Sequence, residues 1–228
     1  MEKILIIIPA YNEEDTIHHT VNRLRNSCSY DFIVVNDGST DRTEEILNEH
    51  QIPHISLAAN LGIGGAMQTG YIYAYRNGYD YAIQLDADGQ HDPKDLEKLV
   101  QAITGSDYDM VIGSRFVEKT GYKGSWIRRL GIYYFYYMLK WIAHIKVTDP
   151  TSGYRIVNRK VMKEFVRHYP VDYPEVEVLV RLAHQHFKIK EIKVEMNERQ
   201  GGQSSITPFR SIYYMLKVTF FSLIRSVF

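Results

Sequence analysis

Three carboxylates lie within three residues after apolar segments, at places where they could bind a cation. Asp86 and Asp88 come after the apolar run that ends at Leu85, and Asp37 follows the run that ends at Val35. Two carboxylates separated by one residue can face one pocket where the chain leaves the regular pleat of a strand. Oxygen ligands suit Mg²⁺ or Mn²⁺, and such ions commonly bridge to substrate phosphates. Asp-x-Asp-Gly is also an ordinary turn sequence, so the pair alone leaves a plain turn and a metal site both open.

Polar and glycine-rich segments follow two further apolar runs. Pro9–Glu14 follows the apolar run Ile4–Ile8, and Asn60–Ala66 follows the run His54–Leu57. The glycines do not fit the G-x-G-x-x-G pattern of dinucleotide-binding proteins, and no G-x-x-x-x-G-K-[ST] phosphate loop occurs. Glycine at the start of a helix does let the backbone approach a ligand closely. A plain tight turn explains Gly64 and Gly65 equally well.

Short apolar runs alternate with helical patterns over the first 112 residues. The runs expected as strands are Ile4–Ile8, Phe32–Val35, His54–Leu57, Tyr81–Leu85 and Met110–Ile112, with helices at 13–26, 41–50, 63–77 and 93–104. This alternation predicts an α/β fold with a mostly parallel central sheet flanked by helices, and ligands beyond the carboxyl ends of the strands. Farther on we expect a helix near 126–145, a loop at 148–155, a helix near 174–186, a strand near 188–195, a glycine-rich loop and a final apolar helix.

Composition and charge exclude several classes of protein. The 228 residues are 45% apolar with 27 basic and 27 acidic side chains, which excludes disordered, collagen-like and coiled-coil proteins. Cys28 is the sole cysteine, so an internal disulfide and a Cys-based zinc site are excluded and a reducing compartment is favoured. The balance is −9 over residues 1–100 and +9 over 115–168. This split suggests a metal-holding part beside a part that handles phosphates or an anionic surface, although two solvated faces explain it equally well.

The motifs, in their order and spacing, resemble those of family 2 glycosyltransferases. The matching segments are Pro9–Glu14, Val35–Asp41, Asn60-x-Gly62 and Asp86–His91. Gly113–Arg115, Asp149–Arg155 and Arg199-x-x-Gly202-x-Ser204 resemble the polyprenyl-phosphate branch, which includes dolichyl-phosphate mannosyltransferases. The resemblance implies a GT-A fold over residues 1–206. The spacing of charged and apolar side chains predicts an amphipathic helix over 207–228. The resemblance also implies inverting, metal-dependent transfer of a sugar from a nucleotide diphosphate sugar to a polyprenyl phosphate.

The same resemblance implies roles for individual residues. Asp86, Asp88 and Gln90 would bind the Mg²⁺ or Mn²⁺ ion, which offsets charge on the departing nucleotide diphosphate. The residues expected to bind the donor are Pro9, Tyr11, Glu13, Asp37, Asn60, Gly62, Asp86, Arg115, Arg199 and Ser204. Among these, Asp37 and the Pro9–Glu13 segment would hold the base and ribose. Arg115, Arg199 and one of Arg128 or Arg129 match or lie near phosphate-binding arginines, a role that suits a planar guanidinium.

The nucleophile determines which further groups the reaction needs. We count Asp149, Asp88 and Arg115 as catalytic candidates, and Asp149 could orient the nucleophile or accept a proton. A lipid phosphate has a second pKa of about 6, so it is largely anionic near neutral pH and needs little help from a base. A glycan hydroxyl would need a carboxylate base, for which Glu175 and Glu177 are candidates. The segment Asp172–Glu177 departs from the Glu-Asp pair typical of family members that add sugars to glycans. This departure favours the lipid phosphate as acceptor.

Other functions and partners remain as alternatives. The chain could extend a glycan, or bind a nucleotide sugar without catalysis, although the intact Asp86 and Asp88 pair argues against the latter. Residues 208–228 and 126–145 combine aromatic and basic side chains, as interfacial membrane helices do, but helices packed against the same domain or a second subunit show the same pattern. No apolar run reaches the roughly 18 residues that a membrane span needs.

We therefore expect a cytoplasmic protein, peripheral on the inner face of the membrane. A small membrane partner protein or a homo-oligomer is compatible with the aromatic helices, and no motif indicates binding to nucleic acid. The sequence does not identify the sugar or the nucleotide.

Overall fold

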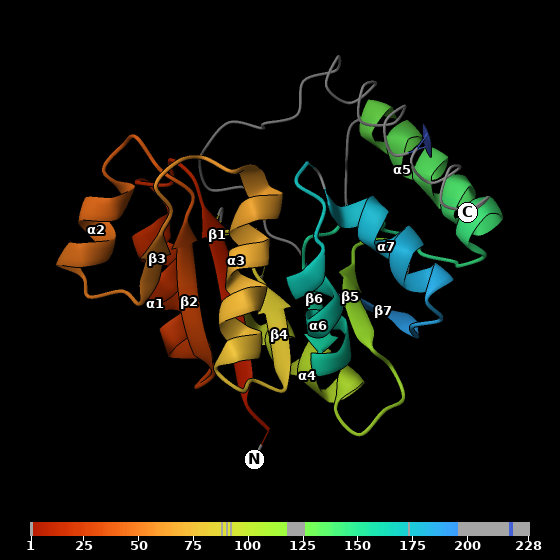
Figure 1. Cartoon of the computed structure of the whole chain (residues 1–228), viewed down its shortest axis with the longest axis horizontal. Helices are drawn as coiled ribbons and strands as arrows, with labels where there is room; N and C mark the ends of the chain where they lie inside the picture. Colours follow the sequence, from red (N-terminus) through yellow and green to blue (C-terminus); the bar gives the residue numbers. More distant parts are fainter. Residues whose placement is uncertain are drawn as a thin grey trace.

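Seven strands form a single sheet in the order β3-β2-β1-β4-β6-β5-β7 (Figure 1). The computed structural model describes residues 2–87, 89, 91, 93–117, 126–172, 174–195 and 219–220. The strands are β1 (Ile4–Ala10), β2 (Asp31–Asn36), β3 (His54–Ser56), β4 (Tyr81–Gln84), β5 (Met110–Ser114), β6 (Arg155–Asn158) and β7 (Ile189–Lys193). The helices are α1 (Ile17–Ser27), α2 (Thr43–Glu49), α3 (Gly62–Arg76), α4 (Leu96–Ile103), α5 (Trp126–Met138), α6 (Arg159–Arg167) and α7 (Pro174–His184).

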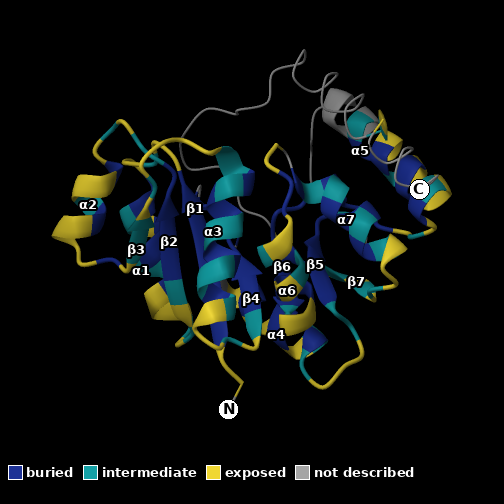
Figure 2. Ribbon diagram, viewed as in Figure 1, coloured by how far each residue is buried: buried dark blue, intermediate teal, exposed yellow. Residues whose placement is uncertain are grey.

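Helices cover both faces of the sheet. Along β1, Ile4, Ile6 and Ile8 pack in a core with α1, α2 and α4. Leu5 and Ile7 pack in a second core with α3, α5, α6 and α7. Successive side chains of a strand point to opposite faces, so a strand buried on both faces must be apolar throughout. This explains the uninterrupted apolar runs in the sequence, and the central strands are dark blue in Figure 2.

The strand directions bring the ends of separate segments to one edge of the sheet. β1 pairs in parallel with β2 and β4, and β2 pairs in parallel with β3, so the carboxyl ends of these strands meet at one edge. β6 runs antiparallel between β4 and β5, with Arg155 opposite both Gln84 and Ile112. The loop before β6 therefore lies at this same edge. The predicted mostly parallel α/β fold is confirmed.

The second half of the chain differs in part from the sequence prediction. β6 and α6 occupy residues 155–167, where a loop to residue 155 and then no element was expected. The predicted helix at 126–145 ends as an α-helix at Met138, continues as a π-helix over Leu139–Ala143, and stops at His144 with φ 55°. The predicted final helix lies outside the described residues, except for 219–220. In the described parts of the chain, no helix is both long enough and apolar enough to cross a bilayer.

Candidate active site

Asp37 closes the end of β2 and is held by the backbone around it. Its N–H donates to the carbonyl of Ala10 at the end of β1 (2.8 Å), and its Oδ1 accepts from the N–H of Leu61 (2.8 Å). Burial raises the pKa of the Asp37 carboxyl, while hydrogen bonds from the N–H groups of Leu61 and Gly62 act in the opposite direction. Asp37 therefore joins the ends of β1 and β2 to the start of α3.

The segment after β1 is tied to the loop after β2. Asn12 has φ 54° and its Oδ1 accepts from the N–H of Thr40 (2.8 Å), while its own N–H donates to Ser39 Oγ (3.0 Å). Tyr11 is exposed, and Pro9 lies within β1 opposite Val35. The first two expected donor-binding segments thus form one continuous edge.

Glu13 is the last residue of the Pro9–Glu13 segment, which is expected to bind the nucleotide sugar, and it forms hydrogen bonds at the start of α1. Its carboxylate accepts from Thr16 Oγ1 (2.6 Å), and its N–H donates to Thr43 Oγ1 (2.9 Å).

The glycines at the start of α3 have separate structural reasons. Gly62 has φ +78°, a conformation that favours glycine, and its N–H donates to Asn60 Oδ1 (2.9 Å). Gly64 lies against the loop that leads to α7: its N–H donates to the carbonyl of Val171 (3.1 Å), and a Cβ would lie 2.0 Å from the carbonyl oxygen of Pro170. The residues expected to bind the nucleotide sugar at the ends of β1, β2 and β3 form what we call the donor edge. Through Gly64, the donor edge packs directly on the segment before α7.

Asp86 follows β4 and presents a carboxylate at the edge of the sheet. Its side chain is 36% exposed. Its Oδ2 lies 3.3 Å from His91 Nε2, and its Oδ1 accepts from Gln84 Nε2 (3.4 Å). Burial raises the pKa of Asp86, but interactions with His91, the hydrogen bond from Gln84 and the charge of Arg115 together lower the pKa below its ordinary value. The carboxylate is therefore ionised near neutral pH and able to ligate a cation.

The surroundings of Asp86 fit a hard divalent ion. A Cβ at Gly153 would lie 3.1 and 3.2 Å from the two carboxylate oxygens, so only glycine leaves this space open. Carboxylate oxygens are the donors that Mg²⁺ and Mn²⁺ prefer. Within the described residues no three histidine, cysteine, aspartate or glutamate side chains form a metal cluster. The other two expected ligands, Asp88 and Gln90, lie outside those residues.

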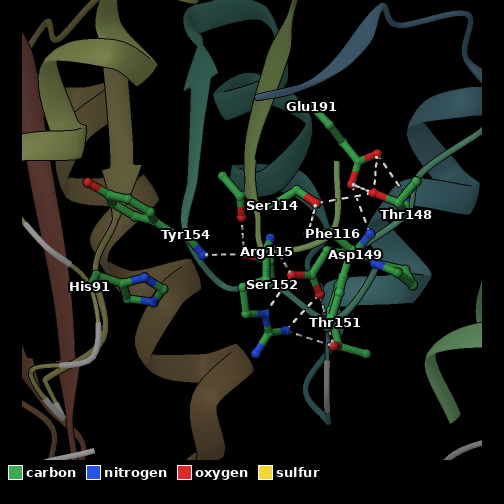
Figure 3. Close-up of polar contacts among 12 residues, drawn as sticks. His91, Ser114, Arg115, Phe116, Thr148, Asp149, Thr151, Ser152, Tyr154 and Glu191 are labelled. Carbon is green, nitrogen blue, oxygen red and sulfur yellow. Dashed lines mark hydrogen bonds and ion pairs between the residues drawn. The ribbon is translucent and has the colours of Figure 1, made fainter. Parts of the chain in front are cut away.

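His91 is a buried partner of Asp86, and the sequence did not assign it a role. It is 4% exposed, and its ring stacks on Tyr154 with centroids 4.4 Å apart (Figure 3). To hydrogen-bond a carboxylate, Nε2 must carry a proton and donate. Nδ1 is buried and has no hydrogen-bond partner among the described residues.

Arg115, which follows β5, and Asp149, in the loop before β6, form a buried ion pair. Arg115 Nε donates to Asp149 Oδ2 (2.6 Å) and Nη2 donates to Oδ1 (2.7 Å), a bidentate arrangement that Figure 3 shows. The Arg115 N–H also donates to Oδ2 (3.1 Å). Asp149 is 0% exposed. The structure therefore brings these two predicted residues together, and each is the other's main polar partner.

Two residues that the sequence did not single out hold the loop before β6. Glu191 of β7 accepts from the N–H groups of Thr148 (2.7 Å) and Asp149 (2.8 Å), and burial raises the pKa of its carboxyl against these hydrogen bonds. Arg155 is buried and donates to the carbonyls of Ser152 (2.6 Å), Glu175 (2.8 Å) and Pro150 (2.9 Å). The Glu191 contacts join segments 42 and 43 residues apart, and the contact of Arg155 with Glu175 spans 20 residues, whereas its contacts with Ser152 and Pro150 lie within the same loop.

Glu175, a candidate base for a hydroxyl acceptor, lies in the first turn of α7. Burial raises the pKa of its carboxyl, the charge of Arg155 opposes this, and the charge of Asp86 adds to it. Glu175 is therefore electrostatically coupled to the expected metal ligand. Glu177 is partly buried two residues farther along α7, while Arg199 and Ser204 lie outside the described residues.

An aromatic surface lies beyond the site, on α5 and the π-helix after it. Its exposed members are Tyr133, Tyr134, Tyr137 and Trp141, of which Trp141 is 74% exposed. The short segment 219–220 lies against α5: Tyr134 Oη and Thr219 Oγ1 are 2.6 Å apart, and Phe220 is also exposed. We refer to these five aromatic residues as the aromatic surface.

Comparisons with known proteins identify relatives over most of the chain. Residues 5–166 match the model of glycosyl transferase family 2. A UDP-N-acetylglucosamine–dolichyl-phosphate N-acetylglucosaminyltransferase of Methanococcus voltae is 34% identical over 70% of this chain and 71% of its own length. A polyprenol monophosphomannose synthase of Mycolicibacterium smegmatis is 27% identical over 95% of this chain and 86% of its own.

A solved structure shares the fold. Glucosyl-3-phosphoglycerate synthase of Mycobacterium tuberculosis, in complex with Mn²⁺, uridine diphosphate and phosphoglyceric acid, matches 99% of this chain and 78% of its own with a TM-score of 0.70 and 18% identity. The match covers the whole sheet and its helices, and it agrees with the expected GT-A fold.

Proposed function

The chain belongs to glycosyl transferase family 2, and from this membership we propose that it transfers a sugar from a nucleotide diphosphate sugar to a polyprenyl phosphate with inversion at the anomeric carbon. One observation carries the choice of acceptor: Asp149, the acceptor-side carboxylate, is fully buried and receives hydrogen bonds from Arg115 on both oxygens. A carboxylate that is closed off from solvent and bound on both oxygens by a guanidinium is not placed to take a proton from an acceptor hydroxyl. A phosphate nucleophile needs no base, because it is already anionic. The named relatives that act on dolichyl or polyprenol phosphates support the same choice.

The donor edge would bind the nucleotide. Asp37, the Pro9–Glu13 segment and the Asn60–Gly62 turn form one continuous edge beyond β1, β2 and β3. Asp86, with Asp88 and Gln90, would hold Mg²⁺ or Mn²⁺, and a bound ion would offset the charge of the diphosphate. Arg199 and Ser204 remain proposed phosphate contacts.

The chain's own residues then shape the transfer. The acceptor phosphate oxygen would form a bond to the anomeric carbon while the bond to the diphosphate oxygen breaks, and the diphosphate would leave with the electron pair. Gly153 leaves space beside Asp86 for the reacting groups, and the Arg115–Asp149 pair, held by Glu191, keeps the loop before β6 in place. Positioning of this kind can supply most of the rate acceleration when the nucleophile is already charged.

A glycan hydroxyl is the second candidate acceptor, because Glu175 could act as the general base that such an acceptor needs. Burial raises the pKa of its carboxyl, and it is coupled to Asp86. A base with a raised pKa near the reacting centre could accept the proton of a hydroxyl nucleophile. Under this alternative Glu175 would be required for turnover.

We further propose that the protein is cytoplasmic and binds the inner face of the membrane through the aromatic surface. Tyrosine and tryptophan favour the boundary between water and lipid, and Lys140 lies on the same helical segment. A lipid-linked acceptor would be presented at that boundary. A small membrane partner protein and a homo-oligomer stay predictions.

A product assay tests the proposal. The protein is incubated with Mn²⁺ or Mg²⁺ and a panel of nucleotide diphosphate sugars, each with a short polyprenyl phosphate, with a soluble glycan, or with neither acceptor. A lipid-linked sugar that requires the metal and is lost in Asp88→Ala supports the proposal and identifies the donor. Transfer to a glycan alone, with no lipid product from any donor, contradicts it.

A further inference from the structure

The side chain of Thr20 binds the segment after β4 instead of its own helix. Threonine hydroxyls within helices often donate to the carbonyl one turn earlier. The Thr20 N–H does donate to the Thr16 carbonyl (2.9 Å), but its Oγ1 donates to the carbonyl of Ala87 (2.8 Å). Thr20 is 6% exposed and Ala87 is 3% exposed. This buried hydrogen bond connects α1 to the residue between the two carboxylates of the Asp-x-Asp motif.

A second side chain of α1 contacts the same turn. Arg23, three residues after Thr20, donates from Nη1 to the carbonyl of Gly89 (3.3 Å). Gly89 is buried and has φ +71°, a conformation that favours glycine. Helix α1 thus holds two backbone carbonyls of the turn, those of Ala87 and Gly89.

The backbone contacts complement those made to the carboxylate. His91 and Gln84 hold the Asp86 side chain, whereas Thr20 holds the carbonyl of the next residue, Ala87. Because a peptide group is planar, fixing the Ala87 carbonyl restricts how the chain can turn on either side of it. The path that the backbone takes after Asp86 therefore depends on the Thr20 hydroxyl.

We propose that Thr20 is a positioning residue for the divalent ion, and that its hydroxyl keeps the turn after β4 in the conformation in which the carboxylates bind. The inference rests on the proposed function, since it takes Asp86 as a ligand. Without the hydroxyl, the Ala87 carbonyl would be buried with its donor removed, and the turn would rearrange to satisfy it. Ligands that are no longer preorganised bind the ion more weakly, even though none of them has changed.

Mn²⁺ binding, measured by the electron paramagnetic resonance signal of the free ion, tests the proposal without relying on turnover. Thr20→Val removes the hydroxyl at nearly constant shape, and Thr20→Ser keeps it. Thr104→Val is the matched control, because the Thr104 hydroxyl donates only to the carbonyl of Val100 at the end of α4. Asp86→Asn reports whether the measured site is the one described. Thermal unfolding of every variant accompanies the titrations.

We expect Thr20→Val to weaken Mn²⁺ binding about tenfold, while Thr20→Ser and Thr104→Val stay within about twofold of the parent protein. If Thr20→Val binds Mn²⁺ like the parent while Asp86→Asn does not bind, the positioning role is overturned and the proposed function stands. If Thr104→Val weakens binding as much as Thr20→Val, the effect is general destabilisation and the inference fails. If the parent protein binds no Mn²⁺, both the inference and the metal-dependent function fail.

Discussion

Replacement of Arg115 by methionine should destabilise the fold strongly. Among the described residues, the Asp149 carboxylate would keep the backbone N–H of residue 115 at 3.1 Å and Thr151 Oγ1 at 3.5 Å, and Asp149 is 0% exposed. Removing one partner of a buried ion pair costs about 3–5 kcal/mol, because the other charge stays buried. For a chain of this length, about 2–4 °C of Tm corresponds to 1 kcal/mol, so Tm should fall by about 6–20 °C.

Urea unfolding followed by circular dichroism measures this change. The exposed pair of Arg167 and Glu164 (3.4 Å) supplies the control, and Arg167→Met should cost less than about 1 kcal/mol. The double variant Arg115→Met with Asp149→Leu should recover much of the loss, because a buried pair can be replaced by apolar groups at little cost. A loss for Arg115→Met no larger than that of the control would refute the structural role and leave the Arg115 guanidinium available to a phosphate.

Three further outcomes follow from the structure. Gly153→Ala would place a Cβ 2.8 Å from Gln84 Nε2 and should displace Asp86. We expect kcat to fall at least tenfold, while the free energy of unfolding changes by about 1 kcal/mol or less. Steady-state kinetics at parent values would contradict this. Because burial raises the pKa of Glu175, the folded protein binds a proton more tightly than the unfolded chain, so part of its stability is lost as pH rises above the ordinary glutamate pKa. Glu175→Gln should lack this loss in urea unfolding at several pH values, and identical pH profiles would show the reasoning to be wrong. Trp141→Ser should weaken flotation with anionic vesicles, whereas Val171→Ser, an exposed apolar residue outside the aromatic surface, should not; equal flotation of both would exclude the aromatic surface as the contact.

The first half of the fold was readable from the sequence because its strands are buried on both faces. Each of the first five predicted strands is found, with ends that move by one or two residues. The placement of Asp37 and Asp86 at one edge followed from parallel pairing with β1. Local apolar pattern and chain order were sufficient for these features.

The second half was less predictable because its order depends on distant contacts. β6 is only four residues long and begins with Arg155, whose charge is satisfied by three backbone carbonyls rather than by water. No short apolar run marks such a strand. The helix after it, α6, does have local signals: Asn158 caps it by accepting from two backbone N–H groups, and its buried residues Val161, Met162 and Phe165 recur at helical spacing.

The same limit applies to the site. Asp149 and Arg115 are 34 residues apart in the chain, and Thr20 and Ala87 are 67 apart. Motifs named the first two residues but not their pairing, and nothing local to Thr20 indicates a contact with the metal-binding turn. Side-chain partners of this kind are set by the packing of elements, which the sequence pattern does not encode at the level of single hydrogen bonds.

The acceptor is the central claim, and transfer to three acceptors measured side by side tests it most directly. The donor identified by the product assay is offered to a short polyprenyl phosphate, to the corresponding polyprenol and to a soluble oligosaccharide, with parent protein and Glu175→Gln. We predict that only the polyprenyl phosphate accepts the sugar and that Glu175→Gln retains most of the rate, because an anionic phosphate needs no base. Transfer to the oligosaccharide or the polyprenol but not to the phosphate, abolished in Glu175→Gln, would contradict the account and identify a hydroxyl-directed enzyme.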